Sequence, residues 1–355
     1  MTINAITHIN LAKSFRGGER QTVLLIKELK KAHPKLRQTL VCHKKSALPE
    51  HLKDVKDLAI VKTGSALGGH FTSLVKADIY QAHEAKAAHW AAIHKKLFHT
   101  PFVIARRVPQ PVRNTFFNRF VYGTADAVVS VSGFIREAVI RSFGRDMNFS
   151  GRLFMVHDAM SHQEADPART AEIRKQYEGH PVFGHAGAYM DRHKGQRILI
   201  AAAREFLKKH PEARFILLGA GSDEEALRNE TRDVPEIQWL GFKDNVPDYL
   251  EAMDFFLFPS RNEGLGSVLL DVMDHGVPVI ASDADGIPEV VRHEKTGLLF
   301  PKEDSAALLS AMERLYGDGE LRKSLVTGAR EQLKNFTPEV MAAKYYELYE
   351  SLLRK

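Results

Sequence analysis

The sequence predicts an α/β protein built from two doubly wound, parallel-sheet domains. Its 355 residues are enough for two domains of ordinary size, each with its own core. Short apolar segments alternate with helical patterns in both halves, and that rhythm indicates parallel strands covered by helices. The segment 157–180, rich in Asp, Glu, His and Pro, is typical of a linker. We therefore expect domains at 1–160 and 161–336, followed by a terminal segment at 337–355.

Eleven strands are expected. Six lie in the first half: Ala5–Asn10, Gln38–Cys42, Ile79–Ala82, Phe102–Ala105, Ala127–Ser130 and Leu153–Val156. Five lie in the second: Val182–His185, Phe215–Leu218, Ile237–Leu240, Phe255–Phe258 and Val277–Ala281. The pattern of 20–31 predicts the first helix, and Thr337 with Pro338 predicts the start of the last one.

Composition excludes several classes of protein. The single cysteine, Cys42, rules out a disulfide framework, and no apolar run approaches the ~18 residues of a membrane-spanning helix. We expect a cytoplasmic protein. Residues 1–160 carry 25 Lys and Arg against 11 Asp and Glu, whereas residues 161–355 carry 25 against 33. The basic half indicates an anionic partner, such as a membrane surface, a phosphorylated glycolipid or nucleic acid, unless it is only a solvated surface.

The most informative segment runs from Phe258 to Asp271. An apolar strand ends at Pro259, a Gly-rich turn presents Glu263, and a helix is expected to open near Ser267 and to stop at Gly276. This order of elements predicts an anion cradle. The first N–H groups of the helix would point at a phosphate, and the helix dipole would favour its charge. The cradle residues are Gly264, Leu265, Gly266, Ser267 and Val268.

This segment resembles the signature of the retaining glycosyltransferases of family 4, which have the GT-B fold. The shared features are two carboxylates separated by seven residues, Glu263 and Asp271, followed by 276–280 and 286–289. The resemblance implies two Rossmann-like domains facing a cleft, with a C-terminal helix crossing back to the N-terminal domain. It also implies that Glu263 holds sugar hydroxyls and that Asp271 holds the ribose. The family usually has Glu where this chain has Asp271, whose side chain is one methylene shorter. Because that position holds the ribose in the family, we expect this difference to alter the affinity for the nucleotide.

A second loop supplies cations. Gly187–Gly195 follows an expected strand and carries Arg192 and Lys194, which could stabilise a departing diphosphate. Lys194 with Gly195 is similar to the family's lysine motif, whereas Ala188 stands where the family usually has arginine. Arg192, which lies close to Lys194 in the sequence, is therefore the candidate to replace that arginine. The resemblance also places the backbone at Gly241, Phe242 and Val246 against the nucleobase.

The N-terminal half contributes three further candidates. Gly17 and Gly18 follow the first strand and open the first helix, where backbone can approach the donor phosphates. His83 ends a strand at the edge where open α/β sheets bind ligands. Arg106 and Arg107 stand where the family often has a second histidine, and they either bind an anionic acceptor or leaving group or are surface residues. No metal-ligand spacing is present, Asp283 and Asp285 included, so neither metal nor cofactor is expected.

The resemblance, together with these residues, implies a metal-independent, retaining hexosyltransferase that uses a nucleotide-sugar donor, with UDP favoured. The segments 105–109 and 116–120 resemble members that build bacterial lipopolysaccharide core and related glycolipids. A glycolipid acceptor and a peripheral contact with anionic membrane are the expected partners. Two alternatives stay open: a nucleotide-sugar epimerase of the same fold, and a nucleic-acid-binding protein using the basic half. No recognition motif for nucleic acid supports the second.

Overall fold

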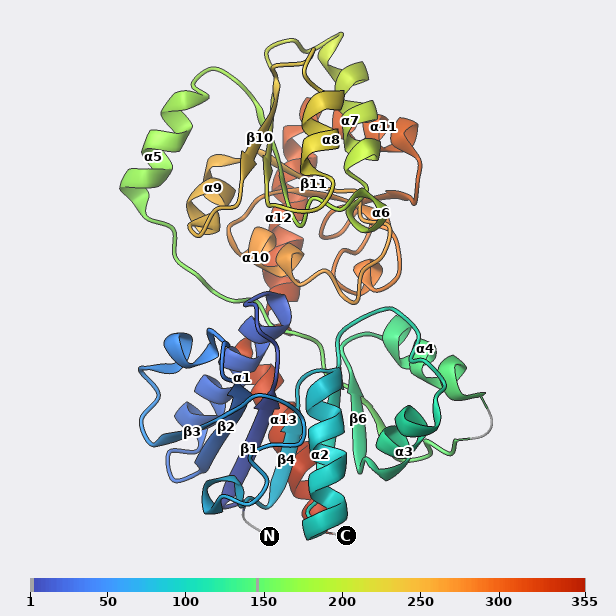
Figure 1. Ribbon diagram of the computed structural model, residues 1–355. Coiled ribbons are helices and arrows are strands. Elements are labelled where there is room, and N and C mark those ends of the chain that lie inside the picture. Colours follow the sequence, from blue (N-terminus) through green and yellow to red (C-terminus); the bar gives the residue numbers. More distant parts are fainter. Residues whose placement is uncertain (1–2, 145–146, 355) are drawn as a thin grey trace. The chain divides into compact units, whose positions relative to one another are not determined.

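A computed structural model describes residues 3–144 and 147–354 (Figure 1). The chain divides into two compact units. The first comprises residues up to Ser161 together with the C-terminal segment from Phe336, and the second runs from His162 to Asn335. Each is an α/β unit with one parallel sheet, which confirms the predicted fold class.

The first unit has a seven-stranded parallel sheet in the order β3-β2-β1-β4-β5-β6-β7. Its strands are β1 Ala5–Asn10, β2 Arg37–His43, β3 Leu58–Thr63, β4 Ile79–Ala82, β5 Phe102–Arg106, β6 Ala127–Ser130 and β7 Leu153–Met155. Its helices are α1 Gly17–Ala32, α2 Ala85–Phe98, α3 Phe116–Thr124, α4 Gly133–Phe143 and α13 Pro338–Leu353, with short 3-10 turns at Leu48–Leu52 and Ser73–Val75.

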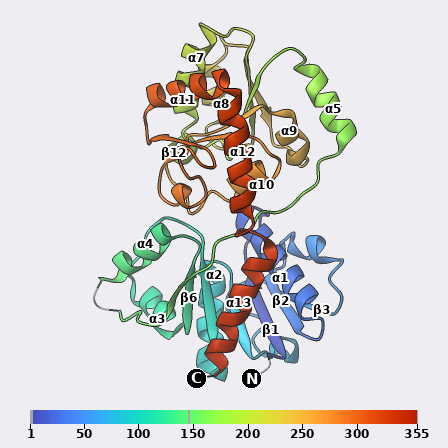
Figure 2. The same cartoon turned by 180° about the vertical axis from the view of Figure 1, so that it is seen from behind.

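The C-terminal helix α13 belongs to this first unit. Figure 2 shows it beside α1 on one face of the sheet. Tyr345 and Tyr349 are buried in one cluster with Leu25 and Leu29 of α1. The ring of Tyr346 stacks on His33 with a centroid distance of 3.7 Å. The helix therefore supplies part of the core that covers β1 and its neighbours.

The second unit has a six-stranded parallel sheet in the order β10-β9-β8-β11-β12-β13. Its strands are β8 Val182–Ala186, β9 Arg214–Leu218, β10 Ile237–Gly241, β11 Phe255–Phe258, β12 Val279–Asp283 and β13 Leu298–Pro301. Its helices are α5 Pro167–Gln176, α6 Asp191–Lys194, α7 Gln196–Leu207, α8 Glu224–Glu230, α9 Val246–Ala252, α10 Val268–Asp274, α11 Ser305–Gly317 and α12 Gly319–Leu333, with a 3-10 turn at Ile287–Glu289. Stacked aromatic rings, including Phe183 and Phe255, fill its core.

Both sheets reverse their strand order at one point, between β1 and β4 in the first unit and between β8 and β11 in the second. At such a point the connections leave in opposite directions, so a crevice opens beyond the carboxyl ends of the two strands. Ligands of open α/β sheets bind there. The segments that follow these four strands are therefore where the functional side chains are to be sought.

Three details differ from the expectations. The sheets contain two strands that were not predicted, β3 and β13, and both lie at sheet edges. The expected linker contains a helix, α5. Its Asp166 side chain caps the helix and its own N–H donates to Asp248, so this part of the segment is attached to the second unit.

Candidate functional site

Lys194 and Glu263 meet beside the switch point of the second sheet. Lys194 follows β8 and Glu263 follows β11, the two strands that flank the reversal. The Lys194 ammonium and the Glu263 carboxylate form an ion pair, with side chains 22% and 13% exposed. The ammonium also lies 5.5 Å from the centre of the Phe258 ring. The fold thus brings together a cation and a carboxylate that lie far apart in the sequence.

Glu263 is held by the loop that carries it and by the loop after β12. The Ser260 hydroxyl donates to the Glu263 carboxylate at 3.3 Å. The Glu263 N–H donates to the Asp285 carboxylate at 3.0 Å, and the Glu263 carbonyl accepts from the Gly286 N–H at 3.4 Å. Burial raises the pKa of Asp285. Asp285, which was expected only to lie in a loop, therefore orients the backbone of Glu263.

The Gly-rich turn between Glu263 and α10 is tightly built. Gly264, Leu265 and Gly266 are buried. Gly266 has a φ of +83°, and a Cβ there would lie 3.1 Å from the Leu269 side chain, so a residue with a side chain would be strained. Ser267 occupies the N-cap position of α10 without a side-chain capping hydrogen bond, and Val268 begins the helix. The first N–H groups of any helix lack intrahelical acceptors, as the predicted cradle requires.

Asp271 lies on α10 one turn after Ser267 and is partly buried. The helix ends at Asp274, and Gly276 follows with a φ of +71°. The structure therefore has the carboxylate, turn and helix in the predicted order. The contacts of Asp271 and of the cradle with a donor stay predictions.

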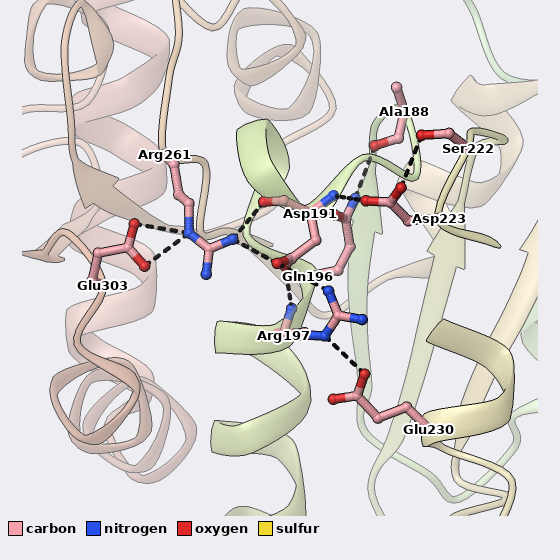
Figure 3. Close-up of polar contacts among 9 residues, drawn as sticks. All are labelled: Ala188, Asp191, Gln196, Arg197, Ser222, Asp223, Glu230, Arg261 and Glu303. Atoms are coloured by element: carbon pink, nitrogen blue, oxygen red, sulfur yellow. Dashed lines mark hydrogen bonds and ion pairs between the residues drawn. The ribbon is translucent and has the colours of Figure 1, made fainter. Parts of the chain in front are cut away.

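A network of charged side chains joins the loop after β8 to the loop after β11 (Figure 3). Arg261 Nη1 donates to both the carboxylate and the carbonyl oxygen of Asp191, at 2.7 and 2.5 Å. Its Nε donates to both carboxylate oxygens of Glu303 at 2.8 Å. Its backbone N–H donates to the His193 carbonyl at 2.7 Å. Arg261 therefore fixes the segment that carries Lys194 against the segment that carries Glu263.

Asp191 is the shared acceptor of this network. Its carboxylate also accepts from the Arg197 N–H at 2.8 Å and from the Arg197 guanidinium at 3.3 Å. Its own N–H donates to Asp223 at 2.8 Å. Burial raises the pKa of Asp191, but the Arg197 N–H and the Arg261 and Arg197 guanidinium groups outweigh it, so the pKa lies below its usual value. Asp191 is therefore ionised at neutral pH.

The two loops also touch through their backbones at Gly195. This residue has a φ of +66°, and a Cβ would lie 2.1 Å from the Pro259 carbonyl oxygen. The backbone after Lys194 can approach the end of β11 this closely only because glycine has no side chain. A glycine is thus needed next to Lys194 for a steric reason.

The other predicted donor residues lie at carboxyl ends of strands or in the loops that follow. Arg192 is exposed on α6, one position after Asp191. Gly241 ends β10 with a φ of +74°, Phe242 is 76% exposed, and Val246 begins α9. Contact of the backbone at these three residues with a nucleobase stays a prediction.

In the first unit, Gly17 and Gly18 are the first residues of α1. Arg16 precedes them, and its backbone N–H donates to the Glu19 carboxylate at 3.0 Å. His83 directly follows β4 and is buried. These segments follow β1 and β4, the strands that flank the reversal in this sheet.

Arg106 and Arg107 differ from free surface cations. Arg107 is buried in an ion pair with Asp158, its Nε donating at 2.8 Å, and its Nη1 donates to the His83 carbonyl at 3.3 Å. Burial lowers the pKa of Arg107, but the nearby Asp158 carboxylate raises it, and the pKa lies above its usual value. The guanidinium therefore stays charged. Arg106 is half-buried and donates to the Gln110 carbonyl. Contact of either residue with an acceptor stays a prediction.

Sequence reasoning missed Asp191, Arg261 and Asp285 as parts of the site. Asp191 and Arg261 are 70 positions apart, and each has the composition of an ordinary surface loop. The available signal was that both lie in loops after strands that flank a sheet reversal, next to Lys194 and Glu263. Only the strand order makes those two loops neighbours.

Metal-binding clusters and membrane-spanning helices are absent from the described ranges 3–144 and 147–354. Within them, no group of three or more His, Cys, Asp or Glu is arranged to hold a metal ion. No helix there has the length and apolar character needed to cross a membrane.

A hollow of about 1220 Å³ lies at the amino ends of β8, β11 and β12, lined by Arg174, Tyr177 and Arg322 among others. It is at the edge of the sheet opposite to Glu263.

Known proteins match this chain over the segment that carries the candidate site. The family model of the glycosyl transferases group 1 matches residues 180–318, which include Lys194, Glu263 and Asp271. A phosphatidyl-myo-inositol mannosyltransferase of Mycobacterium leprae is 30% identical over 185 residues, covering 50% of this chain and 49% of the relative. The matched region thus spans about half the length of that relative. The lipopolysaccharide core biosynthesis mannosyltransferase LpsB of Rhizobium meliloti is 26% identical over 255 residues, covering 68% and 70%.

Among solved structures, Anabaena HepE in complex with UDP and glucose superimposes with a TM-score of 0.80 over 98% of this chain and 99% of that one, at 19% identity. This likeness shows a shared GT-B fold, and the sequence match to a glycosyltransferase family lies within the second unit. Over residues 180–318 the second unit of this chain is similar to the group 1 glycosyl transferases, which agrees with the resemblance to family 4.

Proposed function

We propose that this protein is a retaining glycosyltransferase that moves a hexose from a nucleoside diphosphate sugar, with UDP favoured, to a glycolipid acceptor. The observation that carries the proposal is the pair of Lys194 and Glu263 beside the β8/β11 reversal, next to a Gly-rich turn and a helix start. A donor of this class has hydroxyls at both ends and an anion between them. The site offers carboxylates and a cation in a corresponding order.

Each residue has a proposed role. Lys194, with Arg192 nearby, meets the diphosphate and stabilises the negative charge that grows as the nucleotide leaves. Glu263 accepts hydrogen bonds from sugar hydroxyls, Asp271 accepts from the ribose, and the N–H groups at Gly266–Val268 face the phosphates. Retention follows if the acceptor hydroxyl attacks from the face that the nucleotide vacates.

The ion pair between Lys194 and Glu263 is what an anion-binding site would form in the absence of its ligand. Without a donor, Glu263 neutralises Lys194 and keeps a partly buried ammonium from standing alone. When a diphosphate arrives, Lys194 can turn toward it while Glu263 turns to the sugar. These side chains and helix N–H groups neutralise the diphosphate, so we propose that transfer needs no divalent metal.

Fewer observations bear on the acceptor than on the donor. Two relatives are named for mannosyl transfer, one to phosphatidyl-myo-inositol and one in lipopolysaccharide core biosynthesis. The basic residues 1–160 suit an anionic glycolipid and the membrane that holds it. Phe116 and Phe117 are 88% and 43% exposed at the start of α3, within reach of a lipid surface. We therefore propose that the protein binds peripherally to the cytoplasmic membrane and that the basic residues do not serve to bind nucleic acid.

A thermal-shift screen of nucleotide sugars tests the donor. A ligand at 100 times its dissociation constant stabilises the folded state by about 2.7 kcal/mol, or a melting shift of roughly 5–10 °C for a domain of this size. We expect a shift with at least one nucleoside diphosphate sugar and none with the free sugar. If no nucleotide or nucleotide sugar shifts the protein, the proposed donor site is wrong.

A further inference from the structure

A chain of buried polar side chains runs behind His83 in the first unit. His83 Nε2 lies 3.1 Å from His8 Nδ1, and His8 Nε2 lies 2.9 Å from Gln38 Oε1. Gln38 Nε2 donates to the Ile26 carbonyl at 3.0 Å. His8 and Gln38 are buried on β1 and β2, so these bonds are shielded from water.

The direction of every bond in this chain follows from its far end. The amide nitrogen of Gln38 donates to Ile26, so its oxygen faces His8 as an acceptor. His8 must then carry its proton on Nε2, which leaves Nδ1 as a lone pair. His83 must donate to that lone pair from Nε2. The remaining nitrogen of His83, Nδ1, is therefore an acceptor.

This assignment requires both rings to be neutral, and their surroundings make them so. Burial lowers the pKa of His8 to about 4, against the smaller opposite effect of Gln38. Burial, with His8 and Arg107 nearby, lowers the pKa of His83 well below its ordinary value. A neutral imidazole has one donor and one acceptor, so the directions set by Gln38 leave no alternative.

His83 Nδ1 is buried and has no hydrogen-bond partner among the described residues, and the same is true of Arg107 Nη2. The Arg107 guanidinium lies at the same strand end, because its Nη1 donates to the His83 carbonyl at 3.3 Å. One of these atoms accepts and the other donates. A hydroxyl can satisfy both, since it donates one hydrogen bond and accepts others, whereas the fully ionised diphosphate of a nucleotide sugar has no proton to donate to His83.

We propose that Gln38 and His8 are positioning residues, which hold His83 in the tautomer that accepts a hydrogen bond from a substrate hydroxyl. The inference rests on the proposed function for the identity of the hydroxyl as one on a sugar. The direction of the relay depends only on the fold. A buried acceptor left unpaired is unfavourable, so a hydroxyl that pairs with it binds more tightly than a group that cannot donate.

The direct test reads the protonation of the ring nitrogens by long-range ¹H–¹⁵N correlation spectra of the histidine-labelled protein at neutral pH. His83→Gln and His8→Phe identify the two sets of signals among the 17 histidines. The proposal expects protonated Nε2 and bare Nδ1 in both His8 and His83. A protonated Nδ1 on His83 overturns it. This readout needs no turnover, so it separates the relay from the proposed activity.

The kinetic test compares His8→Phe with His94→Phe. Both replacements keep a buried ring and remove its nitrogens, and His94 likewise pairs with another buried histidine, His70, at 3.2 Å. We expect His8→Phe to slow transfer about tenfold, with nucleotide affinity unchanged, and His94→Phe to leave both unchanged. If His8→Phe does not fold, Gln38→Leu tests the same relay. Wild-type transfer by a folded His8→Phe or Gln38→Leu variant overturns the positioning role.

Discussion

Replacing Arg261 with alanine should separate the two loops of the donor site. The change removes two hydrogen bonds to Asp191 and two to Glu303. Asp191 keeps the Arg197 N–H and guanidinium, so its carboxylate is not left unpaired. A hydrogen bond to a charged group contributes about 1.5–3 kcal/mol, and the pair is only 19% and 10% exposed. We expect a loss of about 2–3 kcal/mol.

The assays are chemical denaturation and steady-state transfer. The stability loss corresponds to a fall in melting temperature of roughly 5–10 °C. Transfer should fall about ten- to a hundredfold, because a displacement of about 1 Å between Lys194 and Glu263 has effects of that size. Arg204→Ala is the matched control. It removes an arginine that pairs with Asp233 through two bonds of 2.7 Å, but there the side chains are 34% and 67% exposed, and such pairs contribute about 0–1 kcal/mol.

The pH dependence provides a further check on the Arg261 variant. The pKa of Asp191 is lowered in the folded state, so its stabilising contribution is present above the unfolded value and is lost as pH falls through the folded one. The stability gap between wild type and Arg261→Ala should therefore be full at pH 7 and should shrink below about pH 4. A gap that is absent at pH 7, or equal to that of Arg204→Ala, would refute the reasoning.

Three other outcomes are expected. Asp271→Asn should weaken nucleotide binding about tenfold or more by calorimetry, because it removes a charged acceptor from the ribose; unchanged affinity would remove Asp271 from the site. Transfer should survive chelation by EDTA, and loss that Mg²⁺ or Mn²⁺ restores would contradict metal independence. Arg113 lies just before α3 and Arg119 lies on it. Replacing both with Glu should reduce co-sedimentation with anionic vesicles at low salt and leave nucleotide affinity unchanged, since each cation contributes about 1 kcal/mol near such a surface; equal binding to zwitterionic vesicles would count against the membrane contact.

The fold was accessible from the sequence because buried parallel strands are short, apolar and separated by helices. Strands such as Ala5–Asn10 and Phe255–Phe258 have the bounds expected of them. The two missed strands are edge strands. β3 and β13 do contain short apolar runs, Leu58–Val61 and Leu298–Phe300, which were not predicted as strands. β3 is partly exposed along its length, and β13 has only four residues and ends at a proline.

The site was only partly accessible. Lys194 and Glu263 follow predictable strands and carry local motifs, so they could be named in advance. Arg107 could not be placed, because its burial depends on Asp158, 51 positions away. The relay through His8 and Gln38 has no sequence pattern either. It exists because β1 lies between β2 and β4, an order that no local pattern encodes.

The proposed function depends above all on Lys194 and Glu263. The most direct measurement is the turnover of purified Lys194→Ala and Glu263→Gln with the donor found by the screen, beside Lys208→Ala as a control from an exposed pair with Glu205. We predict that each site variant loses about a hundredfold or more of the transfer rate while folding normally, because each removes a group placed on developing charge or on the donor sugar. Lys208→Ala should match the wild type. Near-normal turnover in either folded site variant would contradict the account.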